Sequence, residues 1–356
     1  MWRCGNLSKV MTKTSVYHTI VALASIVIII AGLKYSASLI VPFLLSIFMS
    51  LLLMPLLRWL IKKGIPKMVA FFIVIIFVFM LFISISGLIT SQMADLFRNS
   101  EHWQALMVEN LKLWIIKLRG FGLNIDQDLF FSMLQPQKVF TFSLSIVKNA
   151  SMMLSYSFLI FFTVIFMLLE SFSIKTKIEY LEKNGSLGLA HRIDLFTKKL
   201  NHYFTLKAFT SLLTGIWITL VLYVFDVPYP LLWGLGGFML NFIPVIGSII
   251  AAVPPVLIAL ATHGYVDALW IAGWFLVINV VIGNILEPKI MGKGLEISEL
   301  IVFLSLVFWG WVFGKVGMLL AVPLTMIVKF ALETSDSTKW IAILLSDIVK
   351  EKRVKK

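Results

Sequence analysis

Cysteine and charged residues are both scarce in this chain of 356 residues. Cys4 is the single cysteine, so no disulfide can form within the chain and redox chemistry is not expected. Charged residues make up 14% of the sequence, about half the usual share of a soluble domain. Hydrophobic residues make up 60%, and the mean hydropathy is +0.96. This composition argues against a soluble enzyme, a disordered protein and a disulfide-rich secreted domain, and it predicts that lipid surrounds most of the chain.

Acidic residues are few compared with basic ones. There are 18 of them against 31 lysines and arginines, which gives a formal net charge of +13. In a soluble protein this excess would suggest a nucleic-acid partner. No basic run is interleaved with exposed aromatic residues, however, so we expect no nucleic-acid binding. Membrane proteins collect Lys and Arg in their cytoplasmic loops, and this explains the charge more simply.

Motifs for catalysis or for a bound cofactor are missing. Gly292-Lys293-Gly294 lacks the spacing of a P-loop, and no HExxH motif occurs. The glycines at 234–237 lie inside an apolar run, where a dinucleotide fingerprint is not expected. The five histidines are scattered without metal-ligand spacing. We therefore expect no enzyme activity, no cofactor and no metal site.

Apolar runs recur along the whole chain and predict an all-α, polytopic transmembrane protein. The run at 19–33 follows a basic stretch and has small residues behind it at 36–38, as a signal peptide would. Because further apolar runs follow, an uncleaved helix is the simpler interpretation. The predicted full spans lie at about 19–33, 39–61, 68–89, 151–169, 206–225 and 268–286.

Two polar stretches separate these spans. Residues 91–149 have an amphipathic pattern and predict a helical domain outside the bilayer, whereas 170–205 predicts amphipathic helices that continue into the next span. The predicted parts are 1–90 with three transmembrane helices, 91–149 as the extracytoplasmic domain, 150–205 with a fourth transmembrane helix and cytoplasmic helices, 206–332 as a transport domain, and 333–356 as an amphipathic basic tail.

The short loops predict the orientation. The link between the second and third spans carries Arg58, Lys62, Lys63 and Lys67, whereas the link between the first and second carries only Lys34. The segment before the first span is also basic and has no acidic residue. The positive-inside rule then places both termini in the cytoplasm.

The last third of the chain departs from simple spans. It has two pairs of short apolar runs, at about 231–243 with 246–260 and at about 300–312 with 316–328. Each run is too short to cross a bilayer comfortably, since a crossing needs ~20 residues. The positions expected to break these helices, or to act as hinges, are Asn241, Pro244, Gly247, Pro254, Pro288, Gly314, Gly317 and Pro323.

The two interrupted segments resemble each other. Residues 245–254 read VIGSIIAAVP and residues 315–323 read KVGMLLAVP, with one residue gapped. By the loop charges they open from opposite sides, which indicates an inverted repeat; shared composition is the alternative explanation. Paired segments interrupted by Gly and Pro are a sequence pointer to a transporter binding site, because broken helices free backbone groups that must be buried or hydrated.

Few polar residues lie near membrane depth in this region. They are Asn241, Asn279, Asn284 and Glu287. A polar residue inside the membrane is a functional hypothesis by default, so we predict that all four bind or couple the substrate, with Glu287 as a coupling or gating carboxylate. Packing between helices, or a hydrated Glu287 at the interface, is the alternative. On an α-helix, Asn279 and Asn284 would point about 140° apart.

Two motifs resemble the autoinducer-2 exporter family. The first is Asn241-Phe242-Ile243-Pro244-x-x-Gly247 followed by Pro254-Pro255, and the second is Gly283-Asn284-x-x-Glu287-Pro288-x-x-Met291-Gly292 followed by Trp309-Gly310-x-x-x-Gly314-x-x-Gly317-x-x-x-Ala321-Val322-Pro323. The resemblance covers essentially the whole chain and is strongest over 228–333.

The resemblance implies an inner-membrane protein that exports autoinducer-2, a small polar furanone-derived signal. It also implies re-entrant hairpins in inverted repeat, an elevator-like movement and a homo-oligomer, specifically a pentamer. Some members of the family resemble Na⁺/H⁺ antiporters, so cation/proton antiport stays open as an alternative. A membrane scaffold that binds a partner through residues 91–149 is a third interpretation.

Overall fold

A computed structural model describes most of the chain, and every regular element in the described part is a helix, which confirms the all-α fold class. The described residues are 13–120, 157–183, 189–244, 246–291, 297–334 and 337–346. The helices are α1 (Lys13–Tyr35), α2 (Ala37–Lys62), α3 (Lys67–Arg98), α4 (Ser100–Gly120), α7 (Ser157–Lys183), α8 (Leu189–Val224), α9 (Pro230–Leu240), α10 (Ile246–His263), α11 (Tyr265–Ile278), η2 (Asn279–Leu286), α12 (Glu287–Met291), α13 (Glu299–Leu319), α14 (Ala321–Thr334) and α15 (Lys339–Leu344).

Several helices are suited to cross a bilayer. Within the described residues, six are long and apolar enough by length and composition: Ala37–Lys62, Lys67–Arg98, His191–Val224, Ile246–His263, Tyr265–Ile290 and Glu299–Leu319. Shorter apolar helices cover Leu23–Tyr35, Phe158–Ile174 and Pro230–Leu240. The protein is therefore a multi-pass membrane protein. The predicted tail beyond 346, residues 121–149 of the polar stretch and the start of the 151–169 span lie outside the described residues.

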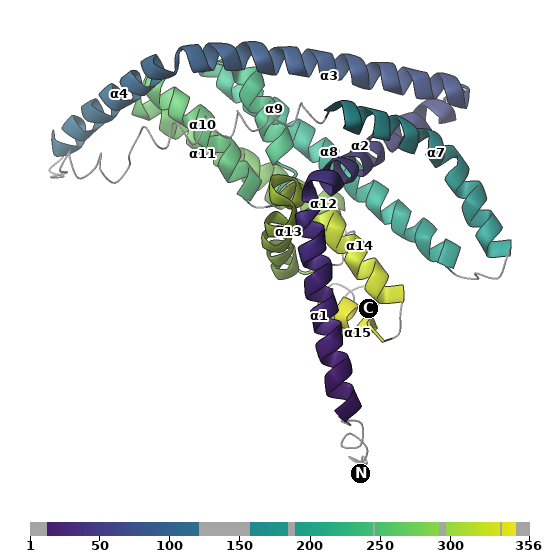
Figure 1. The fold of residues 1–356 in the computed structure, drawn as a ribbon. Helices are drawn as coiled ribbons and strands as arrows, with labels where there is room; N and C mark the ends of the chain where they lie inside the picture. The colour runs from purple at the N-terminus through teal and green to yellow at the C-terminus, as the bar shows by residue number, and fades with distance from the viewer. Residues whose placement is uncertain are drawn as a thin grey trace.

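The N-terminal helices expose much of their apolar surface. In α3, the side chains of Phe72, Ile76 and Met80 are 59%, 57% and 63% exposed. Figure 1 shows α3 and α4 nearly end to end along one side of the molecule, while α1 projects away from them. An apolar surface this large needs an apolar solvent or a partner, as expected for helices that face lipid.

The helix α4 continues α3 and packs on the C-terminal half of the chain. Its buried face carries Met107, Leu111 and Ile115, and the side-chain amide of Asn110 donates to the carbonyl oxygen of Ala261 at 2.9 Å. This contact joins α4 to α10, which lies beneath it in Figure 1. The described part of the 91–149 stretch is therefore helical and docked on the region that carries the interrupted helices.

The long helix α8 connects two hydrophobic clusters. It runs without a break for 36 residues, so the amphipathic stretch does continue into the span as predicted. Near its start, Leu200 and Phe204 pack with residues of α2, α13 and α14. Near its end, Ile218 and Leu222 pack with residues of α3, α4, α9, α10 and α11. The segment between them is the part of α8 on which the site is built.

Glycines allow α9 to approach α8 closely. A Cβ at Gly234 would overlap the side chain of Thr219 and lie 2.7 Å from the carbonyl oxygen of Gly215. We expect Gly234→Ala to destabilise the fold by about 1–3 kcal/mol, because the two helices must separate. Thermal unfolding of the purified protein measures this. Gly236→Ala is the matched control, since nothing lies within 4 Å of its added Cβ; equal unfolding temperatures for the two variants would contradict the close packing.

Interruptions divide both predicted pairs of short helices. Turns at 241–244 separate α9 from α10, and Gly314, with φ 64°, breaks the helical geometry inside α13. The predicted break at Pro254-Pro255 is wrong, because both prolines are buried inside the continuous helix α10. The second pair is interrupted again at Leu320 rather than at Pro323, which lies in the first turn of α14, where an amide N–H has no partner within the helix and proline is tolerated.

The predicted span at 268–286 falls within the apolar helical segment Tyr265–Ile290, which is long enough to cross a bilayer, but its second half is not α-helical. Residues Asn279–Leu286 form a π-helix, η2, between α11 and α12. A π-helix closes its turns with i→i+5 hydrogen bonds, so residues five apart lie close to one face. The expected separation of Asn279 and Asn284 therefore does not apply. Pro288 follows directly as the second residue of α12, near the start of a helical segment, where the missing N–H of proline is tolerated.

Candidate functional site

Four polar side chains form a buried stripe along the middle of α8. They are Lys207, Thr210, Ser211 and Thr214, and we name them the α8 seam. Their spacing of i, i+3, i+4 and i+7 places them on one face of the helix. All are at most 6% exposed. The seam lies between the two hydrophobic clusters that α8 joins.

An ion pair closes the first end of the seam. The Lys207 Nζ atom lies 2.7 Å from Oε1 and 2.9 Å from Oε2 of Glu287, and the two side chains are 8% and 16% exposed. The hydroxyl of Thr210 lies 3.4 Å from Oε2 of the same carboxylate. Glu287 begins α12 at the end of the π-helix, so η2 leads the carboxylate to α8. Because burial makes each charge costly alone, the two charges depend on each other.

A hydrogen bond joins the seam to the first interruption. Asn241, the residue after α9, donates from Nδ2 to the Ser211 hydroxyl oxygen at 3.0 Å. Its side chain is buried, and its backbone N–H bonds to the carbonyl oxygen of Gly237. The threonine hydroxyls of the seam donate within α8: Thr210 to the carbonyl oxygen of Lys207 at 3.2 Å and Thr214 to that of Thr210 at 2.9 Å. The seam thus contacts both the interrupted segment and α12.

The two interrupted segments share a backbone arrangement. A Cβ at Gly247 would overlap the carbonyl group of Leu240, and a Cβ at Gly317 would overlap that of Trp309. Each glycine thus allows the chain after an interruption to pack against the helix before it. The segments also pack on each other, because Ile243 of the first shares a buried cluster with Leu306 and Ala321 of the second.

The sequence as a whole identifies the family. A family model described as AI-2E family transporter matches residues 23–336. The chain belongs to this family. It is 37% identical to the AI-2 transport protein TqsA of Escherichia coli (strain K12) over 332 residues, which cover 93% of this chain and 96% of that protein. It is also 35% identical to a putative transport protein of Haemophilus influenzae, over 94% of this chain and 97% of that protein, and 34% identical to the putative transport protein YhhT of E. coli, over 92% and 94%. The resemblance noted from the motifs is therefore confirmed.

Only part of the predicted site of this AI-2E family transporter meets at the seam. Asn241 and Glu287 do, through Ser211 and through Lys207 with Thr210. The other two predicted residues lie on η2, where Asn279 is half-buried and Asn284 is exposed. The structure thus joins two of the four predicted polar residues to α8.

The seam itself was missed in the sequence. Lys207 lies at the first turn of an apolar run, where a lysine looks like an anchor at the membrane surface. The signal that identifies it is periodicity: the polar residues of KAFTSLLT, from 207 to 214, recur at helical spacing inside an apolar stretch. Only the structure shows that Lys207 is buried and paired with Glu287, a carboxylate 80 residues away.

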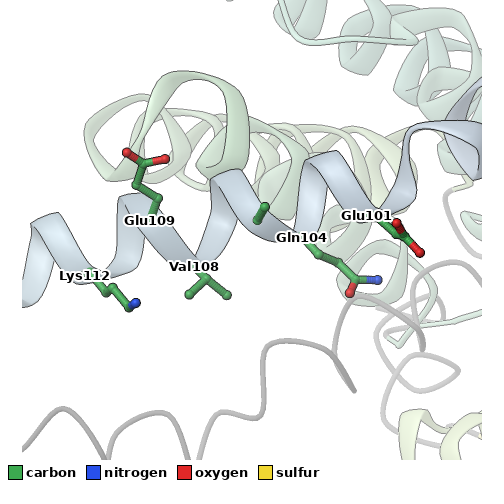
Figure 2. Close-up of a pocket in the computed structure, with 6 residues that line it drawn as sticks. Glu101, Gln104, Val108, Glu109 and Lys112 are labelled. Atoms are coloured by element: carbon green, nitrogen blue, oxygen red, sulfur yellow. The ribbon is translucent and has the colours of Figure 1, made fainter.

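A cavity of about 470 Å³ lies elsewhere, on the polar face of α4. Figure 2 shows its lining side chains, among them Glu101, Gln104 and Lys112, all on this one helix. Because all of these lining residues come from α4, the cavity is an open hollow along one helix. None of the seam residues lines it. Among the residues the structure describes, no three His, Cys, Asp or Glu side chains gather as metal ligands.

Proposed function

We propose that this protein is a secondary transporter that exports autoinducer-2 across the bacterial inner membrane. The observation that carries the proposal is the alignment, over 93% of the chain, with a relative that bears the name AI-2 transport protein. The α8 seam supports it, because buried hydroxyl, amide and paired charged groups inside an apolar helix are suited to a small polar solute.

In the proposed mechanism, the interrupted segments are re-entrant hairpins in inverted repeat, and they move together in an elevator-like manner. The equivalent positions of Gly247 and Gly317 against earlier carbonyl groups support the repeat. Asn241 and Glu287 bind the substrate or gate its passage. Their contacts with α8 close the path of the substrate and must break for it to pass. Asn279 and Asn284 are proposed as further binding or coupling residues on η2, where π-helical turns bring them toward one face.

The proposed arrangement in the membrane follows the loop charges. Both termini lie in the cytoplasm, and residues 91–149 lie outside. A homo-oligomer, specifically a pentamer, would cover part of the apolar surface that α1 and α3 expose, including Ile28 at 71% and Met80 at 63%.

Purified protein in proteoliposomes tests this function. Autoinducer-2 release from the lumen is followed with and without imposed proton and Na⁺ gradients while internal pH is recorded. We expect release that depends on the protein. A Na⁺-dependent pH change without release would instead favour cation/proton antiport, and silence in both measurements would favour the scaffold interpretation.

A further inference from the structure

We infer that the α8 seam is the substrate-binding surface, that it selects a small neutral solute rich in hydroxyl groups, and that transport moves no net charge. The inference rests on the proposed transport function and specifies its substrate class. It starts from four observations: a neutralised ion pair, hydroxyl groups with unused acceptor capacity, an amide donor at an interruption, and their common burial.

The ion pair makes the site neutral. Lys207 and Glu287 are within 2.9 Å of each other and largely shielded from water, so neither charge is available to a charged solute without breaking the pair. A buried charge left alone is costly, which disfavours an anion or a cation as the substrate. Both charges belong to the protein and return to their starting positions when the pair re-forms, so over a complete cycle they contribute nothing to the net charge moved with each solute.

The hydroxyl groups favour a solute that donates hydrogen bonds. A hydroxyl has one donor hydrogen and two acceptor lone pairs. Thr214 uses its donor on a backbone carbonyl group of α8, and Thr210 shares its donor between such a carbonyl group and the Glu287 carboxylate, so both oxygens keep lone pairs as acceptors on the seam. Asn241 supplies the complementary donor from Nδ2, which is now bonded to Ser211. A solute hydroxyl both donates and accepts, so it can replace these bonds when the interruption separates from α8.

Hydrogen bonding between segments does not account for the whole seam. Ser211 and Thr210 make contacts with other segments, but Thr214 bonds, among the described residues, only to its own helix. A valine would fill nearly the same volume in this apolar surrounding. Thr214 is therefore the residue at which substrate binding and structural support can be separated.

The test uses Thr214→Val in proteoliposomes, with Thr205→Val as the matched control. Thr205 makes the same kind of bond, to the carbonyl oxygen of Asn201 at 2.7 Å, but its side chain is exposed on another face of α8. Autoinducer-2 and ribose, a neutral pentose, are the two probes. We expect Thr214→Val to raise the half-saturating concentration of the transported probe about three- to tenfold, the effect of one lost hydrogen bond. Thr205→Val should match the unmodified protein, and both variants should keep its unfolding temperature.

Charge movement is tested in the same vesicles with the membrane potential set by a K⁺ gradient and valinomycin. One charge moved with each solute would change the final concentration ratio about 50-fold at 100 mV. We expect no change of the ratio for the unmodified protein. A ratio that follows the voltage would overturn the inference even if autoinducer-2 is released.

The outcomes separate the inference from the proposed function. Release of autoinducer-2 with unchanged kinetics in Thr214→Val overturns the inference and keeps the exporter. Transport of ribose alone, weakened by the same substitution, keeps the inference and removes autoinducer-2 as the substrate. Transport of neither probe overturns both.

Discussion

Replacing either Gly247 or Gly317 by alanine is expected to abolish transport and to lower the unfolding temperature. In both cases the added Cβ would overlap a backbone carbonyl group, that of Leu240 or of Trp309. The Trp309 carbonyl group lies inside α13 and that of Leu240 accepts from the N–H of Ile243, so neither can rotate away as the end of a flexible side chain can. The chain around each interruption must therefore open, at a cost of at least the about 1–3 kcal/mol that overpacking costs in a well-packed core.

Gly273→Ala provides the control for these two variants. Gly273 lies in α11, and nothing lies within 4 Å of an added Cβ there. Alanine also favours a helix over glycine by about 1 kcal/mol, so this variant should be as stable as the unmodified protein or slightly more so. Thermal unfolding and autoinducer-2 release are measured for all three. A Gly247→Ala protein that transports normally would show that the tight approach at the first interruption is not needed for function.

The pair of glycines also tests the proposed repeat. If the two interruptions perform equivalent roles, both variants lose transport together, whatever the difference between their unfolding temperatures. Loss at only one of them would indicate that the similarity between 245–254 and 315–323 reflects shared composition.

The transmembrane helices were the most predictable part of the fold. The predicted spans 39–61 and 68–89 fall within α2 and α3, because bilayer thickness alone demands a long apolar run. The effect of a proline was less predictable, since it depends on the surroundings. Pro254 and Pro255 are buried in α10, where neighbouring helices support a segment that would break in isolation.

The site was predictable only where a residue was unusual for its position. Asn241 and Glu287 drew attention as polar residues in an apolar region, and both contact α8. Lys207 did not, because basic residues are common where a helix enters a membrane. The π-helix could not be inferred either, since the same apolar sequence is compatible with α-helical turns. The helical spacing of the polar residues from 207 to 214 was visible in the sequence, but the pairing of Lys207 with Glu287 depends on long-range packing, which a local pattern does not contain.

The largest effects on stability are expected at the Lys207–Glu287 ion pair. Lys207→Met or Glu287→Gln alone leaves one buried charge without its partner, which costs about 3–5 kcal/mol. The double variant removes both charges, and replacing a buried pair by neutral groups is often close to neutral for stability. Thermal unfolding of the two single variants and the double variant should therefore show a strong positive coupling.

The exposed pair Lys198–Asp194, on the same helix, provides the control. Its atoms lie 2.6 Å apart, but both side chains are more than half exposed. Lys198→Met should leave the unfolding temperature nearly unchanged, because exposed ion pairs contribute little to stability. An equal loss of stability in Lys198→Met and Lys207→Met would show that burial does not strengthen the dependence between Lys207 and Glu287.

Transport by the double variant separates gating from support. If the pair only holds α12 against α8, a stable Lys207→Met/Glu287→Gln protein releases autoinducer-2 at the normal rate. If the pair is the contact that breaks and re-forms in each cycle, the double variant folds but transports abnormally. Its release of autoinducer-2 is then either slow, or rises with concentration without saturating. We expect the second result, because the carboxylate lies at the end of the π-helix and contacts Lys207 and Thr210 of the α8 seam, and replacing it with a neutral amide removes the attraction that returns α12 to α8.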